Sequence, residues 1–318
     1  MEKTVRQGFY VQPLRRARNL IYRLLEPADW LARRLNQMSR YPPIALRRHI
    51  GHLGMLDGPG YEFVAYLKLL AGLENGDRVW DLGCGCGMLE LALESARWEG
   101  SLIGTDIHPA SIRWARRRIT PRYPCCRFEH ADIRNLAYHP GGKLTAGEWL
   151  AGFREGDFRV VAAKSFFTHL LPEETRLYLR AISDRLIENG RGLLTFFILD
   201  DRAEELMAAG KSAFRFRAPE PDAGYAVRFL SAPSAAVAYR EDFLRVVLAE
   251  AGLEIAGDIR RGCWSGRPDG LSFQDIVVVS RKTSAYLPGF SRKADRPNSG
   301  RSGCLTSGRL PGNHPVKG

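Results

Sequence analysis

Short apolar runs alternate with longer stretches of helical spacing between residues 79 and 279. Five runs rich in branched and aromatic residues predict strands, at 79–82, 102–106, 128–132, 158–163 and 193–199. Between them, apolar residues recur every three or four positions, which predicts helices over 88–98, 110–119 and 173–187. This alternation is typical of an α/β fold, a doubly wound parallel sheet with helices on both faces.

The C-terminal part of this pattern differs. A helical stretch over 240–251 is followed by two further strand-like runs, 253–260 and 273–279. Residues 200–239 follow no regular period, and we interpret them as an insertion that forms a lid or wall for a substrate. After residue 282 Ser, Gly, Pro and Arg replace large apolar residues, which predicts a disordered basic tail over 283–318.

We place the main domain at 51–282 and an N-terminal extension at 1–50. The extension contains a separate helical pattern. Arginines separate its apolar positions, which are Leu20, Ile21, Leu24, Leu25, Trp30, Leu31 and Leu35. We interpret it as a pair of lid or cap helices with a basic face. A helix lying on an anionic membrane is the alternative, but Pro27 interrupts the pattern.

The charge of the chain first suggests a nucleic acid or lipid partner, because the 318 residues carry a formal net charge of +12. Residues 1–50 hold 11 basic and 3 acidic side chains, and residues 281–318 hold 8 and 1. The remainder, 51–280, holds 28 basic and 31 acidic side chains and has a net charge of −3. The positive charge therefore belongs to the two ends, and a nucleic-acid partner is not expected.

The cysteines and the hydropathy favour a reducing, cytoplasmic setting. The sequence has no run of 18 apolar residues, so no membrane span is expected, and no apolar signal-peptide region begins it. Its cysteines resemble neither a secreted disulfide framework nor a paired zinc motif, so no metal is expected. They are Cys84, Cys86, Cys125, Cys126, Cys263 and Cys304.

The segment 79–87 carries the first candidate site, because an apolar strand runs directly into glycines at alternate positions and then into a helix. Glycines permit a sharp turn and a close approach of the backbone to a ligand. The helix N-terminus that follows favours an anionic group. Met88 stands where the dinucleotide fingerprint requires its third glycine, which counts against an NAD-dependent oxidoreductase.

Acidic residues stand at the ends of three successive predicted strands. Asp81 precedes the first glycine, Asp106 ends the second strand, and Asp132 ends the third. A carboxylate in the second position can accept hydrogen bonds from both ribose hydroxyls, and one in the third can reach an exocyclic amine. Singly each acid is better explained as a helix cap or turn residue, but three together favour a ligand site.

The run from Asp81 to Gly87, together with Gly104-Thr105-Asp106, resembles the class I S-adenosylmethionine-dependent methyltransferases. The block from Ser165 to Leu170 resembles a bacterial-type small-molecule subgroup of them. The resemblance implies a Rossmann-like sheet of seven strands whose last strand is antiparallel, with S-adenosylmethionine as cofactor. It implies that the glycines contact the methionine part, Asp106 the ribose and Asp132 the adenine. The implied cofactor residues are Asp81, Gly83, Cys84, Gly85, Gly87, Asp106, Ile107, Asp132, Ile133 and Ser165.

His169 is the candidate general base, since it follows the fourth strand closely and histidine titrates near neutral pH. A helix cap or a hydrogen bond to the backbone explains it equally well. Trp264, Arg267 and Gln274, with Asp275 beside them, are candidate acceptor contacts, although a lone Trp is more often in a core.

The residues after the fourth strand favour methyl transfer to oxygen or nitrogen of a small molecule, such as a sugar or a natural-product intermediate. They lack the Asn/Asp-Pro-Pro-aromatic motif of DNA and RNA amino-methyltransferases, and the Pro-Cys pair of pyrimidine C5 methylation is not there, since Pro124-Cys125 precedes the third strand. Both absences count against a nucleic-acid base as substrate. Two alternatives stay open: an RNA or protein methyltransferase that docks through its basic ends, and a binding module without catalysis. The acceptor and the oligomeric state are not predicted.

Overall fold

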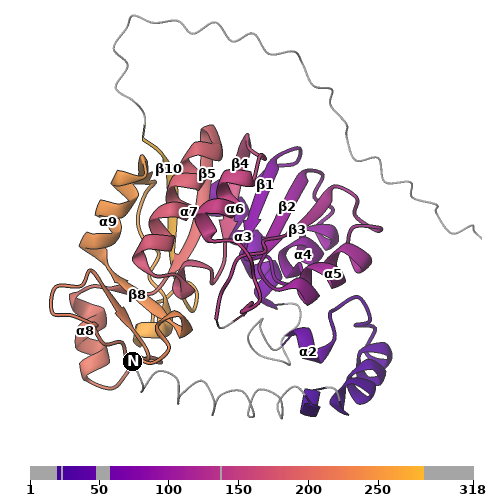
Figure 1. Ribbon diagram of the computed structural model, residues 1–318, viewed down its shortest axis with the longest axis horizontal. Coiled ribbons are helices and arrows are strands. Elements are labelled where there is room, and N and C mark those ends of the chain that lie inside the picture. The colour runs from indigo at the N-terminus through magenta and orange to yellow at the C-terminus, as the bar shows by residue number, and fades with distance from the viewer. Residues whose placement is uncertain (1–19, 23, 48–57, 137, 283–318) are drawn as a thin grey trace, which may run out of the picture.

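A computed structural model describes residues 20–22, 24–47, 58–136 and 138–282; the predicted tail lies outside this range. Seven strands form one sheet in the order β3-β2-β1-β4-β5-β10-β9 (Figure 1). β10 runs antiparallel to both of its neighbours, so the predicted seven-stranded fold with an antiparallel last strand is confirmed. The strands are β1 (Arg78–Leu82), β2 (Ser101–Asp106), β3 (Cys126–His130), β4 (Phe158–Ala163), β5 (Leu186–Phe196), β9 (Leu253–Ile255) and β10 (Asp275–Arg281).

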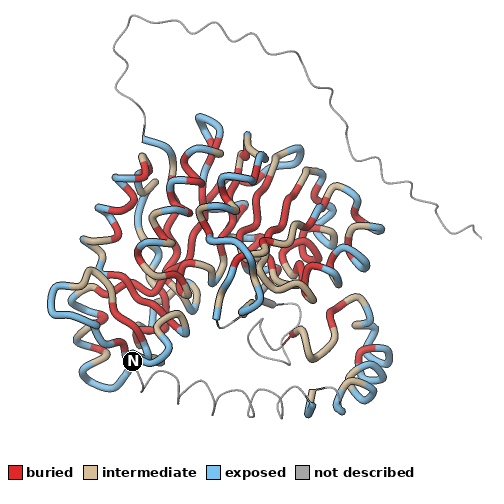
Figure 2. Tube along the Cα trace, in the orientation of Figure 1, coloured by how far each residue is buried: buried red, intermediate tan, exposed pale blue. Residues whose placement is uncertain are grey.

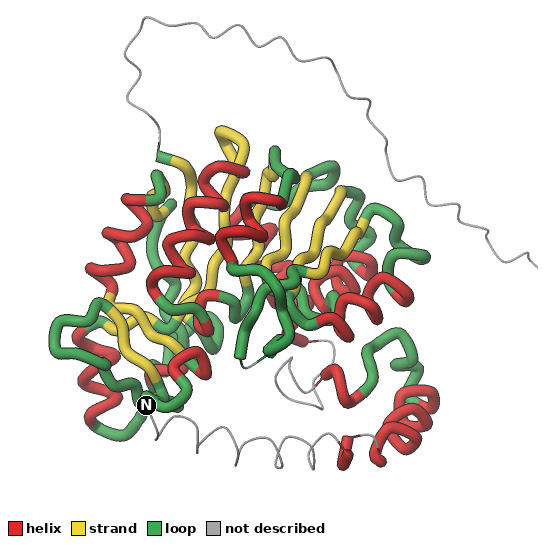
Figure 3. Tube along the Cα trace, in the orientation of Figure 1, coloured by secondary structure: helices red, strands yellow, loops and turns green. Residues whose placement is uncertain are grey.

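Helices cover both faces of this sheet (Figure 3). α3, α4 and α5 pack on one face, and α6, α7 and α9 on the other. α3 and α6 are additions to the predicted set, and α7 ends sooner than predicted because β5 begins at Leu186. Their bounds are α3 (Gly58–Ala71), α4 (Met88–Ser95), α5 (Pro109–Arg118), α6 (Ala146–Gly152), α7 (Pro172–Arg185) and α9 (Glu241–Glu250).

The residues of the central strands are mostly buried, as Figure 2 shows. Along β4, Val160 and Ala162 face the core under α3 and α4, whereas Val161 and Ala163 face the core under α7. Successive side chains of a strand point to opposite faces, so each of these strands needs apolar residues at every position. That requirement explains the unbroken apolar runs in the sequence.

The segment interpreted as an insertion contains regular structure. It includes α8 (Asp201–Ala208), β7 (Tyr225–Val227) and β8 (Val237–Arg240), and these strands pair with β6 (Ile198–Leu199) in a second sheet of order β6-β8-β7. Phe197, Phe216 and Trp264 belong to its own apolar core. We call residues 197–240 the small subdomain; Figure 1 shows it beside the α9 end of the large sheet.

The N-terminal extension is helical over 24–35 and again in α2 (Ile44–Arg47). Asp29 pairs with Arg33 at 2.7 Å and also with Arg47. The apolar stripe of this helix does not pack on the domain, since Leu24 and Leu35 are 71% and 74% exposed. Among the residues the structure describes, no helix is both long enough and apolar enough to cross a bilayer.

Candidate cofactor and acceptor site

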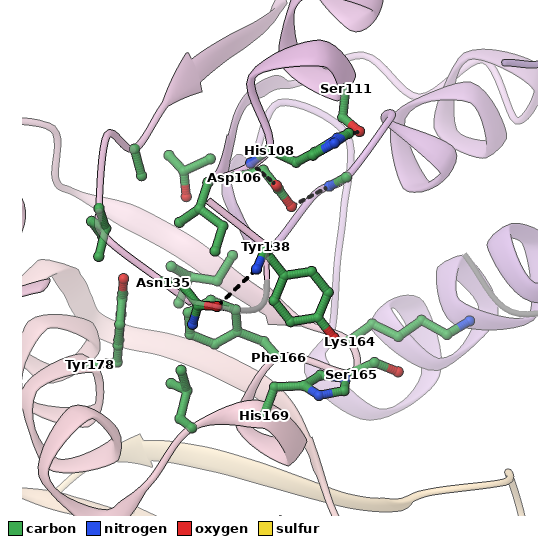
Figure 4. Close-up of a pocket in the computed structure, with 18 of the residues that line it drawn as sticks. Asp106, His108, Ser111, Asn135, Tyr138, Lys164, Ser165, Phe166, His169 and Tyr178 are labelled. Atoms are coloured by element: carbon green, nitrogen blue, oxygen red, sulfur yellow. Dashed lines mark hydrogen bonds between the residues drawn. The ribbon is translucent and has the colours of Figure 1, made fainter. Parts of the chain in front are cut away.

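A cavity of about 200 Å³ opens at the carboxyl ends of β1, β2 and β4 (Figure 4). This is the edge at which doubly wound sheets bind ligands. Its wall is formed by the glycine loop, by the segments that follow β2, β3 and β4, and by α7. Of the predicted site residues it is lined by Gly83, Gly85, Asp106, Ile107, Ile133, Ser165 and His169.

The glycine loop turns away from β1 through three left-handed residues. Gly83, Gly85 and Gly87 have φ angles of 75°, 56° and 79°. Gly83 donates its N–H to the carbonyl oxygen of Thr105 at 2.8 Å, which ties the loop to β2. A Cβ at Gly85 would meet no atom within 4 Å, so the backbone there borders open space that a ligand can enter.

Asp106 braces this loop from the end of β2. Its carboxylate accepts from the backbone N–H of Gly85 at 2.9 Å and from that of His108 at 2.7 Å (Figure 4). Burial raises the pKa of this carboxyl above its usual value, although both hydrogen bonds oppose the shift. Each carboxylate oxygen has two lone pairs, so Asp106 can still accept from a ligand diol.

Asp81 lies behind the loop and is not part of the cavity wall. Its side chain is buried, and burial raises the pKa of its carboxyl to about 7, with a smaller contribution from the nearby charge of Asp106. Lys164 at the end of β4 opposes this shift and lines the cavity itself. Burial also lowers the pKa of the Lys164 ammonium. Lys164 thus borders the cavity, and its charge favours the ionised form of the buried Asp81.

Cys84 and Gly87 also lie behind the loop. The Cys84 side chain is buried, and a Cβ at Gly87 would approach Ile119 to 2.5 Å. Cys86, which the sequence did not single out as a site residue, lines the cavity instead. Asp81, Cys84 and Gly87, every third residue of this segment, thus do not line the cavity, whereas Gly83, Gly85 and Cys86 do.

The acid expected at the end of the third strand is turned away from the cavity. β3 ends at His130, so Asp132 lies beyond it and is not among the lining residues. Its carboxylate contacts Nε2 of His139 at 2.7 Å, and this bond holds the pKa of Asp132 below its usual value. Its neighbour Ile133 does line the cavity, as does Ile107. Adenine contacts by Asp132 and by the two isoleucines stay predictions.

His169 lies in the short helix η1 (Phe167–His169), and its imidazole lines the cavity. Nδ1 lies 3.1 Å from the carbonyl oxygen of Ser234, in the small subdomain. A carbonyl only accepts, so Nδ1 carries the proton and Nε2 keeps its lone pair in the neutral ring. Burial lowers the pKa of His169 below 6.5, so the ring is neutral at pH 7.

Ser165 lies at the cavity with a positive φ of 54°. Its Oγ donates to Oε1 of Gln274 at 3.0 Å, and Thr195 donates to the same oxygen at 2.7 Å. Gln274 does not line the cavity, so it supports Ser165 from behind.

The other two predicted acceptor contacts lie away from the cavity. Trp264 has no exposed surface and donates from Nε1 to Asp275 at 2.7 Å. Arg267 makes two hydrogen bonds of 2.8 Å to Asp200. These bonds tie the hairpin before β10 to the small subdomain. Neither residue reaches the cavity in this structure, and their role as acceptor contacts gains no support from it.

Several polar or aromatic residues of the wall were not predicted as site residues, among them Tyr138, Lys164, Glu174 and Tyr178. Tyr138 lies edge-on to His169 with ring centroids 5.8 Å apart. Glu174 and Tyr178 stand one turn apart in α7, and burial raises the pKa of Glu174. Their four-residue spacing on a helix that begins right after His169 is a signal that could have found them. Lys164 stands next to the predicted site residue Ser165, and this adjacency is a signal that could have identified it.

Comparison with known proteins agrees with the expected family over the part of the chain that holds this site. Residues 79–190 match a family model described as "Methyltransferase domain". The match begins in β1 and ends in β5, so it contains the glycine loop, Asp106 and His169. This segment of the chain is thus similar to a methyltransferase domain.

Individual relatives match only part of the chain. Trans-aconitate 2-methyltransferase from Escherichia coli is 44% identical over 78 residues, 24% of this chain and 27% of that enzyme. Carboxy-S-adenosyl-L-methionine synthase from Chromohalobacter salexigens is 30% identical over 115 residues, 34% of this chain and 43% of that enzyme. The chain thus aligns with less than half the length of either relative.

Solved structures of low sequence similarity also match. One is 1,6-didemethyltoxoflavin-N1-methyltransferase from Burkholderia thailandensis, solved with 1,6-didemethyltoxoflavin and S-adenosylhomocysteine bound. It is 16% identical, with a TM-score of 0.44, over 72% of this chain and 79% of that one.

Proposed function

We propose that this protein is an S-adenosylmethionine-dependent methyltransferase that acts on an oxygen or nitrogen atom of a small molecule. One observation carries the proposal: Asp106, the open backbone at Gly85 and the imidazole of His169 border a single cavity. A cofactor-binding acid and a candidate base thus face the same space. The methyltransferase-domain match over 79–190 agrees with this assignment.

The wall of the cavity offers polar and apolar surface that suits the parts of the cofactor. Asp106 would accept from the ribose hydroxyls, and Ile107 and Ile133 would flank the adenine with apolar surface. The loop from Gly83 to Gly85 would receive the methionine part, with Asp81 behind it. When bound, S-adenosylmethionine supplies a methyl group made electrophilic by the sulfonium.

The protein's remaining tasks are to place the acceptor and to take its proton. Nε2 of His169 accepts that proton, because the neutral ring has its Nδ1 proton on the Ser234 side. Tyr138 and Phe166 at the cavity exclude water from the acceptor. Ser234 of the small subdomain contacts the ring of His169, but no residue of 200–239 lines the cavity, so the expected lid role of this segment stays a prediction. Membership of the bacterial-type small-molecule subgroup is part of this proposal and rests on the resemblance of the block from Ser165 to Leu170.

The test is calorimetric titration of the intact protein with S-adenosylmethionine and with S-adenosylhomocysteine. One site per chain is expected, with the affinity lowered roughly 10- to 100-fold in Asp106→Ala. A folded protein that binds neither compound would remove the cofactor assignment. S-adenosylhomocysteine release is then measured with small acceptors that carry hydroxyl or amine groups, and separately with RNA and with protein. Turnover confined to RNA or protein, with a steep loss of rate at rising salt, would replace the small-molecule proposal.

A further inference from the structure

Behind the cavity wall, His130, Asp132 and His139 converge at the end of β3. Each offers one ring nitrogen or carboxylate oxygen, and these three atoms lie within 4.8 Å of one another. The two imidazole rings meet edge to face, with centroids 5.1 Å apart. None of the three side chains lines the cavity in this structure, so the cluster lies outside the site formed by Asp106, Gly85 and His169.

The backbone fixes this convergence. Lys143 and Leu144 both donate their N–H groups to the carbonyl oxygen of Asp132, each at 3.0 Å. Asn135 and His139 exchange two backbone hydrogen bonds, of 3.0 and 2.8 Å. The chain therefore leaves β3, turns and returns, so His139 is held over Asp132 by main-chain contacts as well as by its ring. A ligand at the three side chains would find them already assembled.

The donor set has the chemistry of a transition-metal site. Two imidazoles and one carboxylate suit Zn²⁺ and Co²⁺, and three protein ligands leave a position for water. The ring of His130 also lies 3.2 Å from the carbonyl oxygen of Ile107, the kind of contact that orients metal-binding histidines. The side chains are reachable by an ion, since those of Asp132 and His139 are 34% and 17% exposed.

We propose that His130, Asp132 and His139 bind one divalent transition-metal ion, Zn²⁺ or Co²⁺. Metal–ligand distances near 2.1 Å place tetrahedral donors about 3.4 Å apart. The contact between Asp132 and His139, now 2.7 Å, opens slightly on binding, and the metal takes the place of the shared proton.

A metal ion at this position would fix one wall of the cavity. Ala131, Ile133 and Tyr138 alternate with the three ligands and line the cavity from the other side of the same segment. A metal that joins His139 to β3 fixes the neighbouring Tyr138 against His169. The metal thus stabilises the position of Tyr138 in the cavity wall and does not contact the reacting atoms.

The experiment uses the full chain, freed of any histidine tag and of metal, with Cys263→Ser as background because Cys263 is an exposed thiol. Co²⁺ is titrated while its visible absorption is followed, and Zn²⁺ is then titrated by calorimetry. One ion per chain is expected, with the visible bands of tetrahedral Co²⁺ and no thiolate charge-transfer band. Zn²⁺ should also raise the melting temperature.

Matched variants separate this site from incidental binding. His139→Gln and Asp132→Asn should weaken Zn²⁺ affinity at least about tenfold and abolish the rise in melting temperature. His108→Gln should change neither, because the His108 ring contacts Ser111 at 2.7 Å and is outside the cluster. No stoichiometric Zn²⁺ binding by the folded parent, or binding unchanged in His139→Gln, would overturn the proposal. S-adenosylhomocysteine binding is measured on the same samples, so failure of the metal site and failure of the cofactor site are read separately.

Discussion

Nδ1 of His169 lies 3.1 Å from the carbonyl oxygen of Ser234, so the small subdomain fixes the orientation of the proposed base. Ser234 lies in η2 (Pro233–Ala235), 65 residues further along the chain. The acceptor of this bond is a main-chain atom, so it depends on the fold of the small subdomain and not on the side chain at position 234. The separate three-stranded sheet thereby becomes part of the candidate active site.

Replacement of His169 separates its two roles. In His169→Asn the amide NH₂ can still donate to the carbonyl oxygen of Ser234, but no group replaces Nε2 as proton acceptor. In His169→Ala the hydrogen bond to Ser234 and the proton acceptor are both lost. We expect kcat to fall about 10²- to 10⁴-fold in both variants, with a lower melting temperature in His169→Ala alone. The measurement is turnover at saturating cofactor and acceptor. Full activity in His169→Asn would reduce His169 to a structural residue.

The pH profile of the parent follows from the same ring. Burial lowers the pKa of His169 below 6.5, so the basic form prevails at pH 7 and above. We expect kcat to be constant there and to fall as pH drops through that lowered pKa, because the protonated ring cannot accept a proton. His169→Asn should lack this acidic limb in its residual rate. An identical limb in the variant would assign the titration to another group.

Asp106 can be tested without turnover. Asp106→Ala removes a charged acceptor for the ribose hydroxyls and the hydrogen bond from the N–H of Gly85. Hydrogen bonds to charged groups contribute about 1.5–3 kcal/mol. We expect affinity for S-adenosylhomocysteine to fall roughly 10- to 100-fold in calorimetry. Asp258→Ala, at an exposed acid, should bind like the parent. Equal affinity in the two variants would exclude Asp106 as a cofactor ligand.

The sequence predicts those parts of the molecule that local patterns determine. The strand runs, the glycine loop and Asp106 were found because a doubly buried strand needs continuous apolar residues and a left-handed turn needs glycine. The boundary of β3 was placed two residues late, and this put Asp132 at a strand end it does not occupy. Because the strand ends at His130, Asp132 lies in the loop that follows, where its side chain contacts His139.

Long-range packing determines what the sequence could not predict. The burial of Trp264 and its bond to Asp275 depend on the small subdomain closing over the last hairpin. Tyr138 reaches His169 only because the loop after β3 folds back through Asn135 and His139. Neither contact joins residues within one element, so no periodicity in the chain predicts them.

The glycine loop offers a matched pair of substitutions. At Gly87, with a φ of 79°, a Cβ would stand 2.5 Å from Ile119 and 3.1 Å from Phe128. At Gly85, with a φ of 56°, it would meet no atom within 4 Å. We expect Gly87→Ala to lower the free energy of unfolding by about 2–5 kcal/mol, the sum of backbone strain and overpacking. Gly85→Ala should cost about 1–2 kcal/mol.

Urea denaturation measures both costs. Gly85→Ala should also weaken S-adenosylhomocysteine binding in the folded protein, because its methyl group occupies space at the cavity. Equal unfolding free energies for the two variants would contradict the packing seen behind Gly87. Unchanged cofactor affinity in Gly85→Ala would place the methionine part of the cofactor elsewhere.

Asp81 makes stability depend on pH in a direction that can be worked out. Its folded pKa of about 7 lies above the unfolded value of about 3.9 because the carboxyl is buried, so folding takes up a proton between these values. The stabilisation is fully present below the unfolded pKa and is lost as pH rises through 7. Asn at this position cannot ionise. From pH 5 to pH 8, Asp81→Asn should therefore gain stability relative to the parent, by about 1–3 kcal/mol.

Urea denaturation of both proteins at pH 5 and pH 8 measures this difference, with Asp258→Asn as the exposed control. The control should follow the parent at both pH values, because its side chain stays in water. Lys164 opposes the shift at Asp81, so Lys164→Met should enlarge the loss of stability toward pH 8. Parallel curves for the parent and Asp81→Asn would mean that Asp81 is ionised throughout this range. The buried acid behind the glycine loop would then already carry its charge before any cationic ligand arrives.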